Sequence, residues 1–97
     1  DDAGRRGKWQ LTASPDGRDG SLAIRQDAAI YLATLEGGEE LNYDLPAGRH
    51  AWLQVLRGGV TLNGQPLSEG DGVAISEEPS LAVRAEKPAE IMLFDLA

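Results

Sequence analysis

The sequence predicts an all-β domain built as a sandwich or barrel. Short apolar stretches follow one another closely along the 97 residues, and glycine, proline, asparagine and aspartate separate them. No stretch shows the period of an amphipathic helix. A chain of this length is typical of one domain and can bury a core without the support of disulfides or a structural metal. The absence of cysteine excludes a disulfide scaffold and a cysteine-ligated metal.

Alternation of apolar and polar residues predicts the strands in the first half of the chain. Trp9, Leu11 and Ala13 share one side of the first strand, and a Ser-Pro-Asp-Gly turn follows it. The stretch 28–35 is apolar on both sides, and its isoleucine and tyrosine favour a covered strand over a short helix. The strands expected here are 9–13, 22–25, 28–35 and 40–45, and a hairpin turn is expected at residues 36–39 between the last two.

Turn residues define the second half and predict a set of hairpins. Gly58-Gly59 joins two apolar strands, and Asn63-Gly64 is the strongest hairpin signal in the chain. Pro66 predicts an edge segment, because proline cannot donate to a ladder. The strands expected here are 51–57, 60–63, 65–67, 73–76, 81–85 and 90–96. We expect structural turns at Gly48, Gly58, Gly64, Gly70, Asp71 and Gly72.

The charge balance argues against two classes of partner. The net charge is -7, with 16 acidic and 9 basic residues, which disfavours nucleic acid and an anionic membrane surface. No apolar run approaches the roughly 20 residues that span a bilayer, so we expect a cytoplasmic protein. The chain begins with Asp1, not Met, and residues 1–8 are polar and contain glycine. We therefore expect a linker or tether at 1–8, a barrel at 9–97, and a longer protein around both.

The order of the turns resembles the conserved motifs of the cupins. Pro46-Ala47-Gly48 precedes His50, and Val55-Leu56-Arg57-Gly58, Gly70-Asp71-Gly72 and Ile75 follow. The wider pattern, from SPDGRDGS through LPAGRHAWLQVLRGGVTLNG to LFDLA, resembles the C-terminal cupin half of bacterial pirin-like bicupins. Some of those proteins are described as quercetin 2,3-dioxygenases. The resemblance implies a cupin-type double-stranded β-helix barrel, jelly-roll-like, over residues 9–97.

The ligands of a catalytic cupin are mostly missing. Such a cupin supplies two histidines and a glutamate from its first motif and a third histidine from its second. His50 could stand at the first position, but Trp52 and Gln54 follow it, and no histidine follows Ile75. The resemblance thus implies that this chain has no catalytic residues and no metal. It also implies a divalent metal (Fe, Ni, Cu or Zn) in an N-terminal cupin of the parent protein, which would be the partner domain.

His50 is the one residue that supports a different interpretation. A lone histidine cannot hold a catalytic metal, which needs about three protein ligands. A site of His50 with Glu77 or Asp71 is a weak candidate. The structural alternative is that His50 begins a strand and hydrogen-bonds a neighbouring loop, and that Asp71 caps the N–H groups of its own turn.

Four aromatic residues are candidate ligand or interface residues. Trp52, Tyr31 and Tyr43 could stack on an aromatic ligand at the barrel mouth, or they could belong to the core. Trp9 and Trp52 are the candidate anchors for a partner domain, because tryptophan is enriched at interfaces.

Three functions follow from these observations. The first is a non-catalytic cupin half that packs on and shapes a metal-bearing N-terminal cupin, in a parent that would be a quercetin 2,3-dioxygenase-like oxidoreductase. It predicts an apolar patch that is exposed when this chain stands alone. The alternatives are a stand-alone small cupin that binds a ligand or forms a homodimer, and a degenerate metal enzyme that uses His50.

Overall fold

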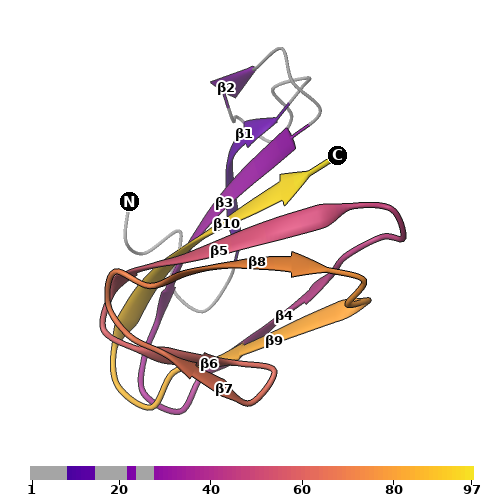
Figure 1. Cartoon of the computed structure of the whole chain (residues 1–97). Helices are drawn as coiled ribbons and strands as arrows, with labels where there is room; N and C mark the ends of the chain where they lie inside the picture. The colour runs from indigo at the N-terminus through magenta and orange to yellow at the C-terminus, as the bar shows by residue number, and fades with distance from the viewer. Residues whose placement is uncertain (1–8, 15–21, 24–27) are drawn as a thin grey trace.

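The expected all-β architecture is confirmed by a computed structural model (Figure 1). It describes residues 9–14, 22–23 and 28–97, and the predicted linker at 1–8 lies outside them. The described residues form ten strands and contain no helix that could cross a membrane. The strands are β1 (Gln10–Ser14), β2 (Leu22–Ala23), β3 (Ala28–Leu35), β4 (Glu40–Asp44), β5 (His50–Arg57), β6 (Val60–Leu62), β7 (Gln65–Leu67), β8 (Gly72–Ser76), β9 (Ser80–Arg84) and β10 (Ala89–Leu96).

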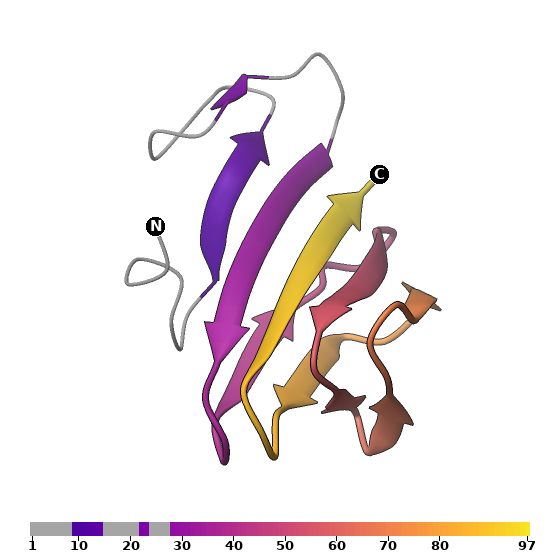
Figure 2. The same ribbon diagram turned by 90° about the vertical axis from the view of Figure 1, so that its left-hand side faces the viewer.

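The strands form two sheets that face each other. The larger sheet has the order β2-β1-β3-β10-β5-β8, and the smaller one has the order β4-β9-β6-β7. All pairs are antiparallel except β1 with β2. Figure 2 shows β1, β3 and β10 side by side, with β4 and β9 behind them. One face of the larger sheet is therefore turned toward the smaller sheet, and its other face is turned outward.

The core lies between the sheets and is aligned by β10. Leu93 of β10 lies opposite Tyr31 of β3 and Leu53 of β5, so the three side chains share the inner face. Cross-strand partners of this kind fill the interior with aliphatic residues from both sheets. The largest side chains that are fully buried are Leu35, Leu53, Leu81, Ile91, Leu93, Val55 and Val83.

Two of the predicted hairpins are wrong. Gly58-Gly59 leads from β5 in the larger sheet to β6 in the smaller one, and the turn at residues 36–39 leads from β3 to β4 in the same way. Gly58 has φ 74°, and a Cβ there would lie 2.4 Å from the Pro88 carbonyl oxygen. A local glycine signal predicts a reversal but not which sheet the chain enters afterwards. Asn63-Gly64 does form a hairpin between β6 and β7.

Two glycine substitutions separate the strain of a turn from the close approach of another segment. Gly64→Ala adds only the strain of φ 86°, because nothing lies within 4 Å of its Cβ. We expect it to lower the free energy of unfolding by about 1 kcal/mol. Gly58→Ala adds the same strain and a collision with backbone, so we expect a loss of about 3 kcal/mol or more. Urea unfolding of both variants tests this, and equal losses would contradict the close packing of Gly58 on Pro88.

Candidate functional site

The residues at the expected ligand positions face away from the interior. His50, Trp52 and Gln54 alternate along β5 with residues that are buried between the sheets. Trp52 Nε1 donates to Gln54 Oε1 over 3.1 Å, and Gln54 Nε2 donates to the Gly70 carbonyl over 3.1 Å. The three side chains therefore form a row on the outer face of the larger sheet. The inner positions between and beyond them hold Ala51, Leu53 and Val55.

His50 begins β5 and contacts one residue of the neighbouring strand. Its Nδ1 lies 2.7 Å from Ser76 Oγ, at the end of β8. Glu77 follows directly, but Asp71 lies at the other end of β8, beyond the pair of Gln54 with Gly72. Among the described residues, no group of three or more His, Cys, Asp or Glu could hold a metal ion. The donors near His50 thus do not fit a metal centre of the kind that cupin chemistry requires.

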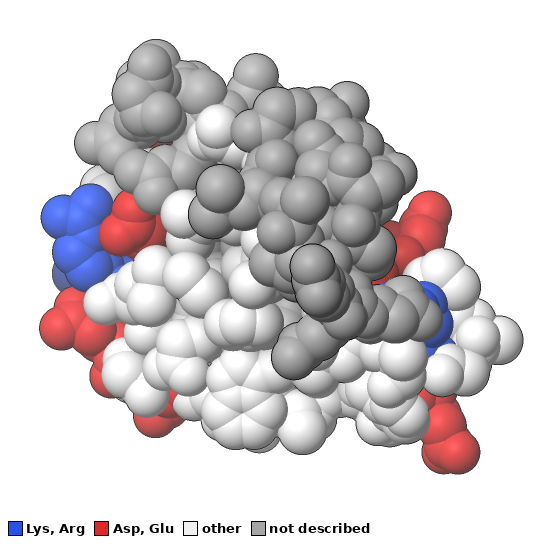
Figure 3. All heavy atoms as spheres, turned by 90° about the horizontal axis from the view of Figure 1, so that it is seen from above, with Lys and Arg blue, Asp and Glu red and all other residues white. Residues whose placement is uncertain are grey.

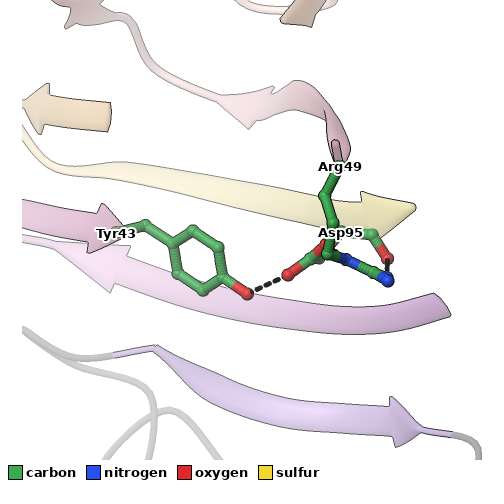
Figure 4. Close-up of polar contacts among 3 residues, drawn as sticks. All are labelled: Tyr43, Arg49 and Asp95. Carbon is green, nitrogen blue, oxygen red and sulfur yellow. Dashed lines mark hydrogen bonds and ion pairs between the residues drawn. The ribbon is translucent and has the colours of Figure 1, made fainter. Parts of the chain in front are cut away.

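The interior carries a charged cluster at the end where β10 finishes. Asp95 is 7% exposed, and its two carboxylate oxygens are used by different partners (Figure 4). Tyr43 donates its hydroxyl to Oδ2 over 2.5 Å, and Arg49 Nε lies 2.6 Å from Oδ1. The Arg49 side chain is 24% exposed, so the ion pair lies at the edge of the core. Burial, and then the hydrogen bond to Asp95, raise the pKa of Tyr43 well above its ordinary value.

Three of the four candidate aromatic residues pack on one another at this interior. Tyr31 and Tyr43 have ring centroids 5.2 Å apart, and Trp9 lies 6.4 and 6.1 Å from them, all in edge-to-face contacts. Trp9 Nε1 also donates to the Asn42 carbonyl over 3.1 Å. Trp52 lies on the opposite face of the larger sheet and is 39% exposed. The structure thus divides the set into an internal cluster of three and one outward residue.

Loops beside His50 enclose a surface pocket of about 380 Å³. Leu45, Pro46 and Pro79 belong to its apolar part, and the polar side chains that line it are Arg49, His50, Glu77 and Glu78. The pocket is separate from the Tyr43–Asp95 contact, although Arg49 belongs to the lining of the one and to the ion pair of the other. It places His50, Glu77 and Glu78 at one cavity, but these residues are not grouped so that three of them could hold a metal ion.

Asp95 is the site residue that sequence reasoning did not single out. The signal was present in the last strand, where Ile91, Leu93 and Asp95 alternate with residues of the other face. A carboxylate in phase with buried aliphatic residues must find partners, because an unpaired buried charge is costly. The partners, Tyr43 and Arg49, are 52 and 46 residues away in the sequence, so only the fold could identify them.

Tyr43→Phe tests the energetic role of the cluster. We expect the free energy of unfolding to fall by about 1–3 kcal/mol at neutral pH, because Asp95 Oδ2 loses its donor. The raised pKa of Tyr43 means that the folded state keeps a proton which the unfolded chain releases above about pH 10. This stability is fully present below that pH and is lost as the pH rises further. Urea unfolding from pH 7 to 11 should show a steeper alkaline loss in the original chain than in the variant, and identical slopes would contradict this assignment.

Comparison with known proteins places the whole barrel in one family. Residues 11–96 match the family described as "Quercetinase C-terminal cupin domain". The chain is 42% identical over 87 residues to the quercetin 2,3-dioxygenase of Escherichia coli strain K12. That alignment covers 90% of this chain and 38% of the relative, so the chain spans well under half the length of the curated relatives it matches.

Solved structures agree with this result. The crystal structure of YhhW from Escherichia coli has a TM-score of 0.90 at 42% identity, with 92% of this chain and 38% of that one covered. A structure of the bacterial pirin YhhW from Escherichia coli in complex with nickel(II) has a TM-score of 0.88 at 42% identity, with 91% and 38% covered. The resemblance inferred from the turn motifs is thereby confirmed, and the chain belongs to the family of quercetinase C-terminal cupin domains.

Proposed function

We propose that this chain is the non-catalytic half of a longer two-cupin protein, and that it packs on and shapes an N-terminal cupin that bears a divalent metal. The observation that carries the proposal is the apolar outer face of the larger sheet. The chain's membership of the family and its match to less than half of each curated relative also support it. The parent's activity would be that of a quercetin 2,3-dioxygenase-like oxidoreductase.

The outer face consists of cross-strand rows with little charge. Phe94 of β10 lies between Ile30 of β3 and Trp52 of β5, and Met92 lies beside Leu32 in the next row. None of these five side chains is fully buried, and Trp52 is among the exposed large hydrophobic residues. A contiguous apolar surface of this kind is typical of a site that another protein surface covers. We call these five residues the outer apolar face.

Trp52 is held in place as an anchor for such a contact. Its indole lies over Gly72 of β8, where a Cβ would come within 2.3 Å of the ring. Its N–H group is already used by Gln54, so the exposed part of the side chain is hydrocarbon. A preorganised aromatic residue loses little conformational entropy on binding, which is why such residues dominate interfaces.

The polar groups inside the barrel support a non-catalytic role for this chain. Asp95 is neutralised by Arg49 and hydrogen-bonded by Tyr43, so its oxygens are occupied by this chain's own groups. The row of His50, Trp52 and Gln54 lies outside the barrel. The residues of this chain would therefore act on the parent's metal site only through packing.

Trp52→Lys tests the interface when the 97-residue chain and a full-length parent are compared. We expect the parent to lose about 2 kcal/mol or more of unfolding free energy, because a charge is placed in a covered apolar contact. The isolated chain should change much less, since Trp52 is already 39% exposed there. Asn42→Lys is the matched control, because Asn42 is exposed on the smaller sheet.

Sedimentation of the isolated chain belongs to the same test. A similar small loss in both proteins would contradict the interface. A stable homodimer of the isolated chain that Trp52→Lys dissociates, together with an unaffected parent, would favour the alternative of a dimerising stand-alone cupin.

Elemental analysis tests the assignment of the metal to the other half. We expect the full-length parent to contain a stoichiometric divalent metal and to keep it after His50→Ala. The isolated chain should bind none, because His50 belongs to no group of three or more possible ligands among the described residues. Metal in the isolated chain that is lost in His50→Ala would instead support a degenerate metal enzyme.

A further inference from the structure

β8 is the last strand of the larger sheet and has one side without a partner strand among the described residues. Two hydrogen bonds just before β8 show which of its residues direct their backbone groups toward β5. The Val55 N–H donates to the Asp71 carbonyl, and the Val55 carbonyl accepts the Gly70 N–H, both over 2.9 Å. In an antiparallel ladder, successive residues direct their N–H and C=O groups to opposite sides of the strand. Val73 and Ile75 therefore direct their N–H and C=O groups toward β5.

The remaining residues of β8 turn their backbone groups outward. Gly72, Ala74 and Ser76 therefore present a row of N–H and C=O groups to the open side of the sheet. All three are exposed. Such a row is a template for another strand.

The edge lacks the features that usually prevent strand addition. Natural edge strands carry proline, lysine or inward-pointing charges. The other edge on this side, β7, has Pro66, whereas β8 has the sequence GVAIS, without proline or any charge. The side chains of Gly72, Ala74 and Ser76 are small, so they do not obstruct a chain that approaches the edge in the plane of the sheet. β8 is therefore open to strand addition, whereas Pro66 hinders it at β7.

A groove beside β8 gives an added strand a place to lie. It has a volume of about 320 Å³ and runs between β8 and the β6–β7 hairpin. Leu62 and Gln65 line it from the hairpin, and Ala74 and Ser76 line it from β8. An added strand lies about 4.8 Å from its neighbour, so its side chains could contact both walls.

The charges around β8 specify the sign of the partner. Glu69 and Asp71 precede the strand, and Glu77 and Glu78 follow it. The sequence has no lysine or arginine from residue 58 to residue 83, and no ion pair between described residues involves these four carboxylates. In the view of Figure 3, acidic side chains stand at both sides of the molecule, and basic side chains lie beside them. Both ends of the edge would therefore attract a cation.

We propose that the outward edge of β8 is a docking site for an extended, positively charged segment of another polypeptide, which adds to the larger sheet as a further strand. The backbone groups of Gly72, Ala74 and Ser76 would hold the segment, and the carboxylates at the two ends would select its charge. The site is distinct from the outer apolar face, because it uses the rim of the sheet. It is therefore independent of the proposed contact with an N-terminal cupin.

A second copy of this chain fits the edge less well. Antiparallel pairing of two β8 strands would bring Glu77 and Glu78 of one copy to Glu69 and Asp71 of the other. Like charges at both ends of the ladder would repel each other. The charge pattern thus favours a cationic segment over self-association.

The probe for this site is a synthetic peptide of about eight residues in which lysine and valine alternate. We expect it to slow amide hydrogen exchange at Gly72, Ala74 and Ser76 in the 97-residue chain, while exchange at Val73 and Ile75 changes little. A peptide with glutamine in place of every lysine should bind about tenfold more weakly or worse. Added salt should also weaken the binding of the lysine peptide.

Ala74→Pro removes one outward N–H group and leaves the inner ladder intact, since proline is tolerated on an edge where the N–H faces solvent. We expect Ala74→Pro to lower the affinity for the lysine peptide about tenfold. Ala74→Thr, which keeps the N–H group, is the matched control and should bind normally. Preserved exchange protection at Val73 and Ile75 in Ala74→Pro shows that β8 is still folded.

Three results would overturn the proposal. The first is the absence of protection at the three outward amides with about 1 mM peptide, which is enough to detect weak binding. The second is protection that maps to the outer apolar face or that persists in Ala74→Pro. The third is a dimer of the chain alone that Ala74→Pro abolishes, because a second copy would then be the occupant.

Discussion

The central place of β10, between β3 and β5, is the constraint on which the rest of the structure depends. β10 pairs with β3 along its whole length and with β5 from Glu90 to Leu96. This register decides which side of each strand faces the smaller sheet. A slip by one residue would move every buried side chain to the outside. Leu53 and Leu93, both fully buried, make such a slip very costly.

The same alternation that buries Leu93 also buries Asp95, two residues later. Charge at this position is tolerated because Tyr43 reaches it from strand β4 of the smaller sheet and Arg49 reaches it from the loop before β5. The interior of the barrel therefore ends in a satisfied polar cluster beside the packed rings of Trp9, Tyr31 and Tyr43. Buried polar groups that are fully paired fix one arrangement of the surrounding chain.

The register also separates two surfaces with different physics. The outer apolar face offers side chains, and its recognition would depend on area and shape. The edge of β8 offers backbone groups, and its recognition would depend on alignment and charge. Trp52 and Ala74 are cross-strand neighbours, yet one belongs to the first surface and the backbone of the other belongs to the second. Substitutions at the two positions can thus affect the two surfaces separately.

Much of the fold and little of the site could be read from local sequence. Strand positions followed from alternation, and the hairpin at Asn63-Gly64 followed from two residues that accept positive φ. The motif order around His50 was enough to indicate the family. The side to which His50 points was not apparent, because alternation shows that His50, Trp52 and Gln54 share a face but not which face is buried. The glycines at residue 58 and at residues 37–38 predicted reversals, and the passage from one sheet to the other was missed.

The sequence by itself determined the all-β class, most strand positions, the acidic charge and the scarcity of metal ligands. All of these depend on residue types and on contacts between near neighbours in the chain. Only the tertiary structure decided that Asp95 meets Arg49 and Tyr43, that Trp52 faces outward, and that β8 is an edge. These features depend on strands that are distant in sequence, and their pairing minimises exposed apolar surface over the whole chain rather than within any one segment.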